Sequence, residues 1–102
     1  MYAVVRTYSG QGASEVFDLI VRLDGEVRDL IQGAPGFVSY TAVRSGSGGT
    51  TVSVCQDKAG TDETTRRAAA FLKDKMTGPL EPPLITDGEV VLQFGAVASV
   101  PA

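Results

Sequence analysis

The chain has 102 residues, a formal net charge of −3 and 43% hydrophobic residues, which is enough for one domain with a single core. Its nine basic and twelve acidic residues include no basic run, so nothing supports a nucleic-acid or anionic-membrane surface. The absence of histidine excludes Ser-His and Cys-His nucleophile pairs, histidine-ligated haem and the usual catalytic zinc sites. We therefore expect neither a metal nor a cofactor.

Cysteine usage and the first residues bear on location. Cys55 is the single cysteine, so it has no partner for an internal disulfide. Residues 1–6 lack the basic-then-apolar order of a signal peptide, and no apolar run approaches the roughly 18 residues that a membrane-spanning helix needs. We expect a cytoplasmic protein that does not contact a membrane.

The first half of the chain predicts a strand, a helix and a second strand. Residues 2–8 are rich in β-branched and aromatic residues, and a Gly-containing turn follows them. Ser14 suits a helix N-cap, and apolar residues recur every three or four positions as far as Ile31, which predicts one long amphipathic helix. Pro35 then bars helix continuation, and residues 37–44 alternate like a strand.

The second half predicts a hairpin, a helix and a last strand. A Gly-containing loop, residues 45–49, precedes a second β-rich run, residues 50–56. Thr61 suits the N-cap of a helix that stops before Gly78-Pro79. Residues 77–87 read as an extended loop, residues 89–94 as the last strand, and residues 95–102 as an apolar tail.

This order predicts one α+β domain over residues 1–94 with the ferredoxin-like βαββαβ arrangement. Such a domain has a four-stranded antiparallel sheet with two helices on one face. The pattern does not indicate whether the loop 77–87 covers a pocket or where the tail runs.

The alternation of the strands assigns their faces, if the hairpin closes symmetrically about Ser47. Because burying Arg6 beneath helices would be costly, we expect the alternate residues Ala3 and Val5 to face the helices. The other predicted helix-facing residues are Val38, Tyr40, Ala42, Val52, Val54, Val90, Leu92 and Phe94. The opposite face then mixes polar and apolar residues, namely Tyr2, Val4, Arg6, Tyr8, Phe37, Ser39, Thr41, Val43, Thr51, Ser53, Cys55, Val91 and Gln93.

This mixed face covers on the order of 400 Å², from strand and residue spacings. A monomer rarely exposes a larger apolar area. We therefore expect a homodimer that pairs these open sheet faces. The polar residues among them suggest a hydrated cavity between the protomers.

The joint Pro35-Gly36-Phe37, the loop glycines Gly48-Gly49 and the order of elements over residues 2–94 resemble the dimeric α/β-barrel superfamily. Within it the chain is similar to the antibiotic biosynthesis monooxygenase-like domains, and the segment 57–63 is similar to uncharacterised small bacterial members. The resemblance implies face-to-face dimers with a ligand cavity. Some members oxidise phenolic or polycyclic substrates without a cofactor, while others have no established reaction. The haem-degrading branch is disfavoured, because the chain lacks histidine and tryptophan.

Two functions stay open. The first is a small-molecule-binding protein whose cavity takes a small aromatic ligand, and the alternative is a cofactor-independent monooxygenase of phenolic or quinol-type substrates. In both, the expected pocket residues are Arg6, Tyr8, Ser39, Thr41, Ser53, Cys55 and Gln93. Arg6 would stabilise a phenolate, although it could instead pair with an acidic residue. Cys55 more closely fits a small buried hydrophobe than a nucleophile. No catalytic residue is assigned.

Overall fold

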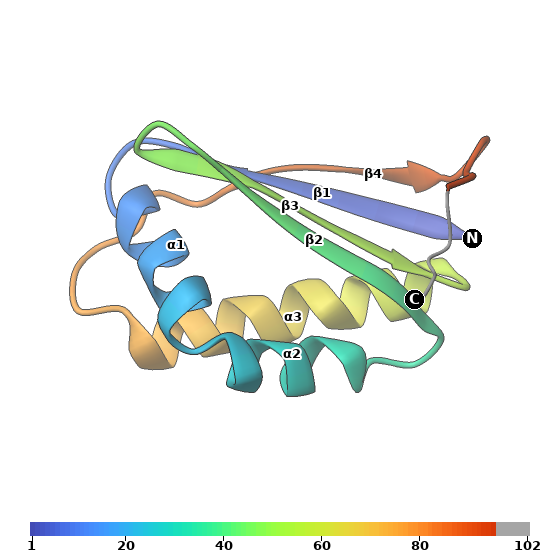
Figure 1. The fold of residues 1–102 in the computed structure, drawn as a ribbon, viewed down its shortest axis with the longest axis horizontal. Helices are drawn as coiled ribbons and strands as arrows, with labels where there is room; N and C mark the ends of the chain where they lie inside the picture. The colour runs from blue at the N-terminus through green and yellow to red at the C-terminus, as the bar shows by residue number, and fades with distance from the viewer. Residues whose placement is uncertain (96–102) are drawn as a thin grey trace.

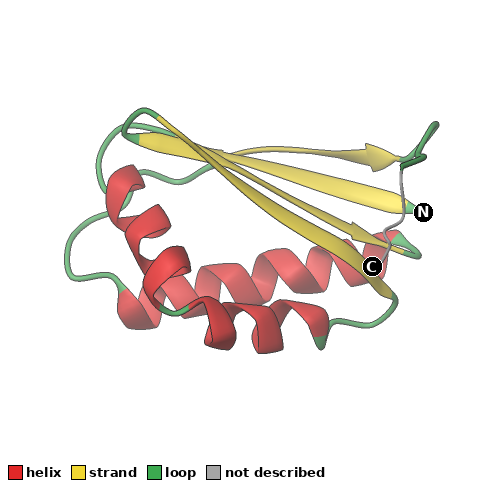
Figure 2. Ribbon diagram, viewed as in Figure 1, coloured by secondary structure: helices red, strands yellow, loops and turns green. Residues whose placement is uncertain are grey.

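A computed structural model describes residues 1–95, in which one four-stranded sheet carries three helices on one face (Figure 1). The elements are β1 Tyr2–Tyr8, α1 Ala13–Arg22, α2 Asp24–Gln32, β2 Phe37–Ser45, β3 Gly48–Cys55, α3 Lys58–Lys75 and β4 Leu84–Glu89. The strand order is β2-β3-β1-β4, with every neighbouring pair antiparallel. The predicted α+β ferredoxin-like fold is therefore confirmed, and Figure 2 shows its two layers.

The predicted first helix is divided into two at Leu23. The backbone of Leu23 leaves the helical region at φ −114° and ψ 36°. Its N–H still donates to the Leu19 carbonyl (2.8 Å), and its carbonyl accepts from the Val27 N–H (3.0 Å), so the break leaves neither group unpaired. The change of direction lets α1 bury Val16 and Phe17 and α2 bury Val27 against the same core.

The last strand lies earlier than the sequence predicts. β4 is Leu84–Glu89, and it pairs along β1 from Thr7 opposite Leu84 to Tyr2 opposite Glu89. The predicted strand over residues 89–94 is wrong, since the structure gives residues 90–95 no strand. The sequence pattern pointed to the more apolar run, whereas β4 is an edge strand whose mostly exposed residues need no apolar alternation.

The hairpin between β2 and β3 has a two-residue turn, Gly46-Ser47, in place of the predicted five-residue loop. Gly46 adopts φ 59°, which a glycine reaches without strain, and Ser45 lies opposite Gly48. The register therefore differs by one residue from the predicted one, which turns β3 over. The helix-facing residues of β3 are Thr51, Ser53 and Cys55, and the predicted inward placement of Val52 and Val54 is wrong.

The faces of β1 are also reversed from the prediction. Val4, Arg6 and Tyr8 are 2%, 1% and 4% exposed beneath the helices, and the alternate residues Ala3 and Val5 face the other way. The prediction treated a buried Arg6 as too costly, but hydroxyl groups on β3 and α3 receive its N–H donors. Tyr40 and Ala42 of β2 do face the helices as predicted, because they lie opposite Ser53 and Thr51.

β2 carries an irregularity between Phe37 and Ser39. Phe37 lies opposite Cys55 and Ser39 opposite Val54, so Val38 is the extra residue of a β-bulge. As a result Phe37 and Tyr40, three positions apart, both pack against the core.

The core lies between the helices and the middle of the sheet. Its buried residues are Tyr8, Ala13, Val16, Phe17, Leu19, Val27, Ile31, Phe71 and Leu72. The rings of Tyr8 and Phe17 meet edge to face, with centroids 6.1 Å apart. Close packing continues at Gly49, where an added Cβ would lie 2.7 Å from the Phe17 ring.

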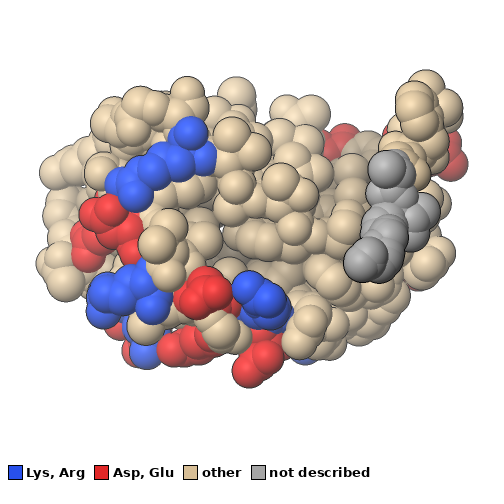
Figure 3. Space-filling model, viewed as in Figure 1, with Lys and Arg blue, Asp and Glu red and all other residues tan. Residues whose placement is uncertain are grey.

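The opposite side of the sheet, which we call the open face, carries no charged side chain in the register of the described strands. Its residues are Ala3, Val5, Thr7, Ser39, Thr41, Val43, Thr50, Val52, Val54, Leu84, Thr86 and Gly88. In the space-filling view the Lys, Arg, Asp and Glu side chains gather mainly over the helices, and most of the sheet region is without charge (Figure 3).

Candidate functional site

Arg6 is a buried cation at the centre of the helix-facing side of the sheet. Its Nη1 donates to Thr51 Oγ1 and Ser53 Oγ of β3, both at 3.2 Å. Its Nε donates to Thr65 Oγ1 (3.1 Å) and its Nη2 to Thr64 Oγ1 (2.7 Å), both on α3. We call these four residues the hydroxyl cage. Two elements far apart in the sequence thus hold the guanidinium plane in place.

The hydroxyl cage solvates the charge of Arg6 without neutralising it. No carboxylate of the described residues lies within 4.0 Å of its nitrogens, whereas eight ion pairs form elsewhere among those residues. A guanidinium has five N–H donors, and the four hydrogen bonds leave one N–H of Nη2 without a partner in residues 1–95. Burial lowers the pKa of Arg6, but a guanidinium remains protonated in proteins. Buried charges are usually paired, so an anion bound here would be stabilised by Arg6.

Two tyrosines adjoin this cation. Burial raises the pKa of both Tyr8 and Tyr40, and the opposing effect of the Arg6 charge is smaller. Both phenols are therefore protonated at neutral pH and can donate a hydrogen bond. The hydroxyl of Tyr8, a residue that is 4% exposed, has no hydrogen-bond partner among the described residues. A bound oxygen atom would satisfy it.

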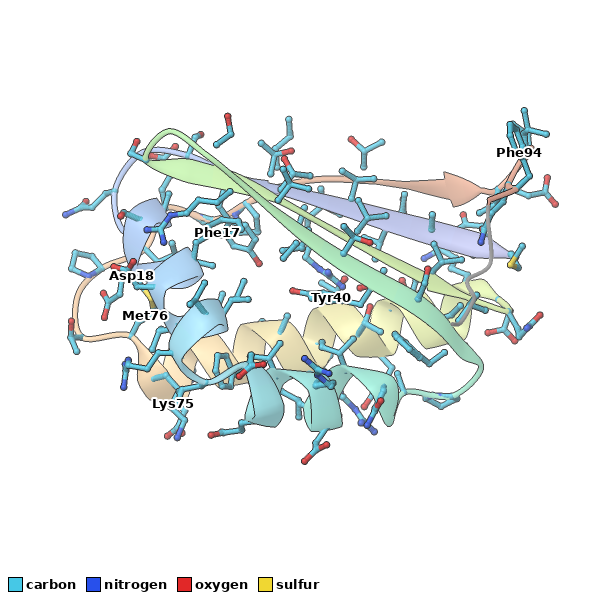
Figure 4. The ribbon with its side chains drawn as sticks, in the orientation of Figure 1. Phe17, Asp18, Tyr40, Lys75, Met76 and Phe94 are labelled. Atoms are coloured by element: carbon cyan, nitrogen blue, oxygen red, sulfur yellow. The ribbon has the colours of Figure 1, made fainter. Side chains whose placement is uncertain are left out.

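Two grooves open between the sheet and the helices. The first, the α3–β4 groove, has a volume of about 440 Å³ and reaches Arg6 and Tyr8. Its walls are mainly apolar and include Leu72, Met76, Leu80, Pro82, Pro83 and Ile85. The second, the α2–β2 groove, has a volume of about 500 Å³ and is lined by residues that include Val27, Ile31, Phe37 and Tyr40. Figure 4 shows Tyr40 extending from β2 into the space between the two layers.

A small pocket lies between the two grooves. Its volume is about 20 Å³, room for a single water, and it is lined by both Tyr8 and Tyr40. Tyr8 also lines the α3–β4 groove, and Tyr40 also lines the α2–β2 groove. The two phenols therefore separate three adjoining spaces, with Arg6 on the α3–β4 side.

The segment after α3 forms one wall of the α3–β4 groove. The Glu15 carboxylate accepts hydrogen bonds from the Thr77 N–H (2.9 Å) and hydroxyl (2.8 Å), and these bonds lower the pKa of Glu15. Farther along, the Glu81 N–H donates to the Gln11 carbonyl (2.9 Å). Residues 78–83 are thus held against the end of β1 and the start of α1, with Leu80 facing the groove.

The structure brings together only some of the predicted pocket residues. Arg6 donates a hydrogen bond to Ser53, and Tyr8 lies beside Arg6. Cys55 shares their face but packs against Gly60, where an added Cβ would lie 3.1 Å from its sulfur. It is 0% exposed, and burial raises the pKa of its thiol, so it behaves as an inert core residue.

The remaining predicted residues lie apart from Arg6. Ser39 lines the α2–β2 groove beside the bulge. Thr41 is exposed on the open face, and Gln93 is exposed beyond β4. Thr41 lies on the predicted side of the sheet, but Arg6 and Ser53 lie on the other side, and the placement of Gln93 followed from the wrong last strand.

Sequence reasoning missed the hydroxyls of α3. Thr61, Thr64 and Thr65 recur at the three- and four-residue spacing of one helix face, and Thr61 and Thr64 are 1% and 0% exposed. The helical spacing of these threonines, on a helix with few apolar residues, was the feature of the sequence that could have indicated a polar face toward the sheet. Thr64 also donates to the Thr61 carbonyl (2.7 Å), which fixes its oxygen for the bond from Arg6.

Within residues 1–95 there is no group of three or more His, Cys, Asp or Glu side chains that could hold a metal ion. None of the described helices is long and apolar enough to cross a membrane.

The fold is similar to solved structures of proteins with several activities. A protein of unknown function from Nitrosomonas europaea, NE2512, is 19% identical with a TM-score of 0.59, covering 99% of this chain and 93% of that one. The monooxygenase ActVA-Orf6 of Streptomyces coelicolor, solved with nanaomycin D, is 21% identical with a TM-score of 0.58, covering 97% and 92%. The haem degrader MhuD of Mycobacterium tuberculosis, solved with two haems, is 18% identical with a TM-score of 0.59, covering 92% and 98%.

These comparisons confirm the predicted resemblance to antibiotic biosynthesis monooxygenase-like domains, at the level of the fold. At such identities the likeness shows the fold alone. No protein-family model and no curated protein sequence matches the chain.

Proposed function

We propose that this protein binds a small aromatic molecule that carries an anionic oxygen, a carboxylate or a phenolate, in the α3–β4 groove. The observation that carries the proposal is the buried charge of Arg6, which no carboxylate of the described residues balances. A ligand anion would supply the missing counter-charge through the free N–H of Nη2, a charge-assisted bond of the stronger kind. The hydroxyl of Tyr8 would donate a second hydrogen bond to the same oxygen.

The shape and lining of the groove favour a flat apolar body behind that oxygen. About 440 Å³ lies within the usual range of small-molecule sites, and its walls are mostly aliphatic side chains and prolines. Because Arg6 is held by four hydrogen bonds before any ligand binds, little side-chain entropy would be lost on binding. Arg6, Tyr8 and Ser53 are the predicted pocket residues that this proposal uses.

A matched pair of probes tests the charge requirement. We expect 2-naphthoate to bind at least ~10-fold more tightly than 2-naphthamide in calorimetry, a difference of about 1.4 kcal/mol, because only the acid is anionic. In Arg6→Met this preference should disappear, while Cys55→Ser, outside the groove, should keep it. Equal binding of the acid and the amide to the native protein would contradict the proposal, as would an unchanged preference in Arg6→Met.

A cofactor-independent monooxygenase is the second candidate, favoured by the position of Tyr8 beside Arg6. Arg6 would stabilise the phenolate of a bound phenol, which makes the ring electron-rich enough to react with O₂. In the overall reaction one oxygen atom enters the ring as a second carbonyl, the other leaves as water, and the phenol supplies all four electrons. The phenol O–H and one ring C–H bond are broken in forming the quinone.

Oxygen uptake separates the two candidates. Substrate-dependent O₂ consumption with dihydroxynaphthalenes and related quinols, lost in Arg6→Met, would favour the oxygenase. Tight binding of these compounds without O₂ consumption would favour the binding protein alone.

We also propose that two chains associate through their open faces. The uncharged mixture of Val, Thr, Ala and Leu on this side supports pairing, because charges are depleted at the centres of interfaces. Sedimentation should show a dimer at micromolar concentration, and Val52→Lys, which places a charge in the middle of this face, should give a monomer. A native monomer at these concentrations would contradict the dimer. Two further predictions remain proposals. One is a cavity between the paired sheets of the dimer, and the other is a cytoplasmic location.

A further inference from the structure

We propose that residues 90–94, which we call the arm, pack against a second copy of the chain. This inference rests on the proposed dimer and adds to it a contact outside the sheet. The three large apolar side chains of the arm, Val91, Leu92 and Phe94, are 92%, 76% and 86% exposed. Single exposed apolar residues are common, but three within four positions form a patch that suggests a partner.

The start of the arm is anchored to the sheet. The Val90 N–H donates to the Met1 carbonyl (2.9 Å), continuing the pairing of β4 with β1 by one bond. Beyond this bond the chain leaves the sheet at the end of β4 (Figure 1). The arm therefore has a fixed origin at one end of the open face.

The arm projects toward the side that a second copy would occupy. Figure 4 places Phe94 beyond the end of β4, on the side of the sheet opposite the helices. Its ring therefore lies away from the core, which α1, α2 and α3 cover. A second copy stacked on the open face would come within reach of this ring.

Interface area supports the same partner. Four paired strands present on the order of 400 Å² of open face, from their spacings. A stable interface usually buries about 800 Å² on each partner. One phenylalanine can bury roughly 150 Å² or more, so Phe94 and its two neighbours would recover much of the difference. In a two-fold dimer each chain would give one arm and receive one.

The chemistry of the arm matches the open face rather than a charged partner. Residues 90–94, Val-Val-Leu-Gln-Phe, contain no charge, and neither do the open-face positions of the described strands. An acidic or basic partner would gain nothing from either surface. A second copy offers an uncharged apolar surface to both.

The absence of tryptophan makes the contact measurable. Because the native chain contains no Trp, Phe94→Trp introduces a single indole whose emission reports its exposure. We expect the emission of this variant to shift to the blue with rising protein concentration, in step with dimer formation measured by sedimentation. Val21→Trp is the matched control, since Val21 is 70% exposed on α1, and its emission should not change.

Two further variants separate the arm from the sheet contact. Val52→Lys combined with Phe94→Trp should remove the blue shift, because the monomer leaves the indole in water. Phe94→Ser alone should weaken dimerisation at least ~10-fold through lost apolar burial.

The outcomes distinguish the arm from the dimer itself. A native chain that dimerises while the indole of Phe94→Trp keeps the emission of an exposed group would overturn the arm and leave the sheet contact. A blue-shifted emission that persists in the monomeric Val52→Lys, Phe94→Trp variant would also overturn it, since the arm would then pack on its own chain. A native chain that stays monomeric would overturn the arm and the proposed dimer together.

Discussion

The substitution Arg6→Met separates two roles for the buried guanidinium, a ligand anchor or a structural centre. Methionine is unbranched, somewhat shorter than arginine and uncharged, so the variant removes the desolvation penalty of the cation along with its four hydrogen bonds. Replacing buried ions by apolar residues of similar volume is often neutral or stabilising by about 1–4 kcal/mol. Each hydroxyl left without its donor opposes this by about 1 kcal/mol, and Thr64 keeps its bond to the Thr61 carbonyl. We therefore expect the free energy of unfolding of the ligand-free variant to lie within about 2 kcal/mol of the native value.

The difference should appear when an anionic ligand is present. At 100 times its Kd a ligand stabilises the native state by about 2.7 kcal/mol. For a domain of this size that raises Tm by about 11–22 °C, at about 4–8 °C per kcal/mol. If Arg6→Met weakens binding ~10-fold, the same 2-naphthoate concentration should give it only about half of this increase, about 1.4 kcal/mol.

Urea titration of both proteins, followed by thermal unfolding with and without 2-naphthoate, measures each quantity. Arg6→Lys, which keeps the charge but loses the planar fork, should retain part of the increase in Tm. A loss of more than about 4 kcal/mol in ligand-free Arg6→Met, together with no Tm increase for the native protein, would refute the reasoning. Arg6 would then be a structural residue.

Three other predictions concern the groove, the hairpin and the surface charge. Ala69→Trp, whose side chain would enter the α3–β4 groove, should weaken 2-naphthoate binding at least ~10-fold in calorimetry. The control Ala70→Trp lies outside this groove and should not weaken binding. Equal losses in the two variants would contradict the placement of the ligand in the α3–β4 groove. Gly49→Ala should lower the free energy of unfolding, measured by urea titration, by about 1–3 kcal/mol, because the added Cβ would meet a carbonyl of β2 and a ring of α1. Gly88 has open space around it, so Gly88→Ala should leave the free energy of unfolding nearly unchanged. Hydrogen bonds from Arg66 and Arg67 hold the pKa of Glu63 at about 2, so the stabilising effect of Glu63 is complete above its ordinary pKa of 4.5 and is lost as the pH falls toward 2. Glu63→Gln should therefore lessen the drop in the urea midpoint between pH 7 and pH 3. An unchanged drop would argue against these hydrogen bonds as a source of acid lability.

The order of the elements could be predicted because local signals and the fold agree. Pro35 and Gly36 end the second helix and begin β2 where the pattern indicates, and the alternation of β2 and β3 identifies both strands. The faces could not be predicted, because alternation shows which residues share a side but not which side the helices cover. The valines of β1 and β3 lie partly on the open face, while the hydroxyls of β3 lie toward the core.

The candidate site was missed in part for the same reason. A buried arginine is costly only when its donors have no acceptors, and the acceptors of Arg6 lie on β3 and α3, 45 to 59 positions later in the chain. A strand pattern alone carries no information about Thr64 and Thr65. The last strand was misplaced because an edge strand needs few apolar residues, whereas the arm is apolar without being a strand.

The bulge at Val38 sets which spacing of aromatic residues β2 can tolerate. Because one extra residue lies between Phe37 and Ser39, both aromatic rings of the strand turn toward the α2–β2 groove although they are three positions apart. Removing Val38 would leave Phe37 and Tyr40 two positions apart, and regular alternation would still place them on the same side of the strand. A chain one residue shorter here would therefore keep both aromatic walls of this groove without a bulge, whereas a chain of the same length without the bulge would turn one ring to the other side of the sheet. The spacing of the two aromatic residues, together with the presence of the bulge, is the quantity to compare between chains of this fold.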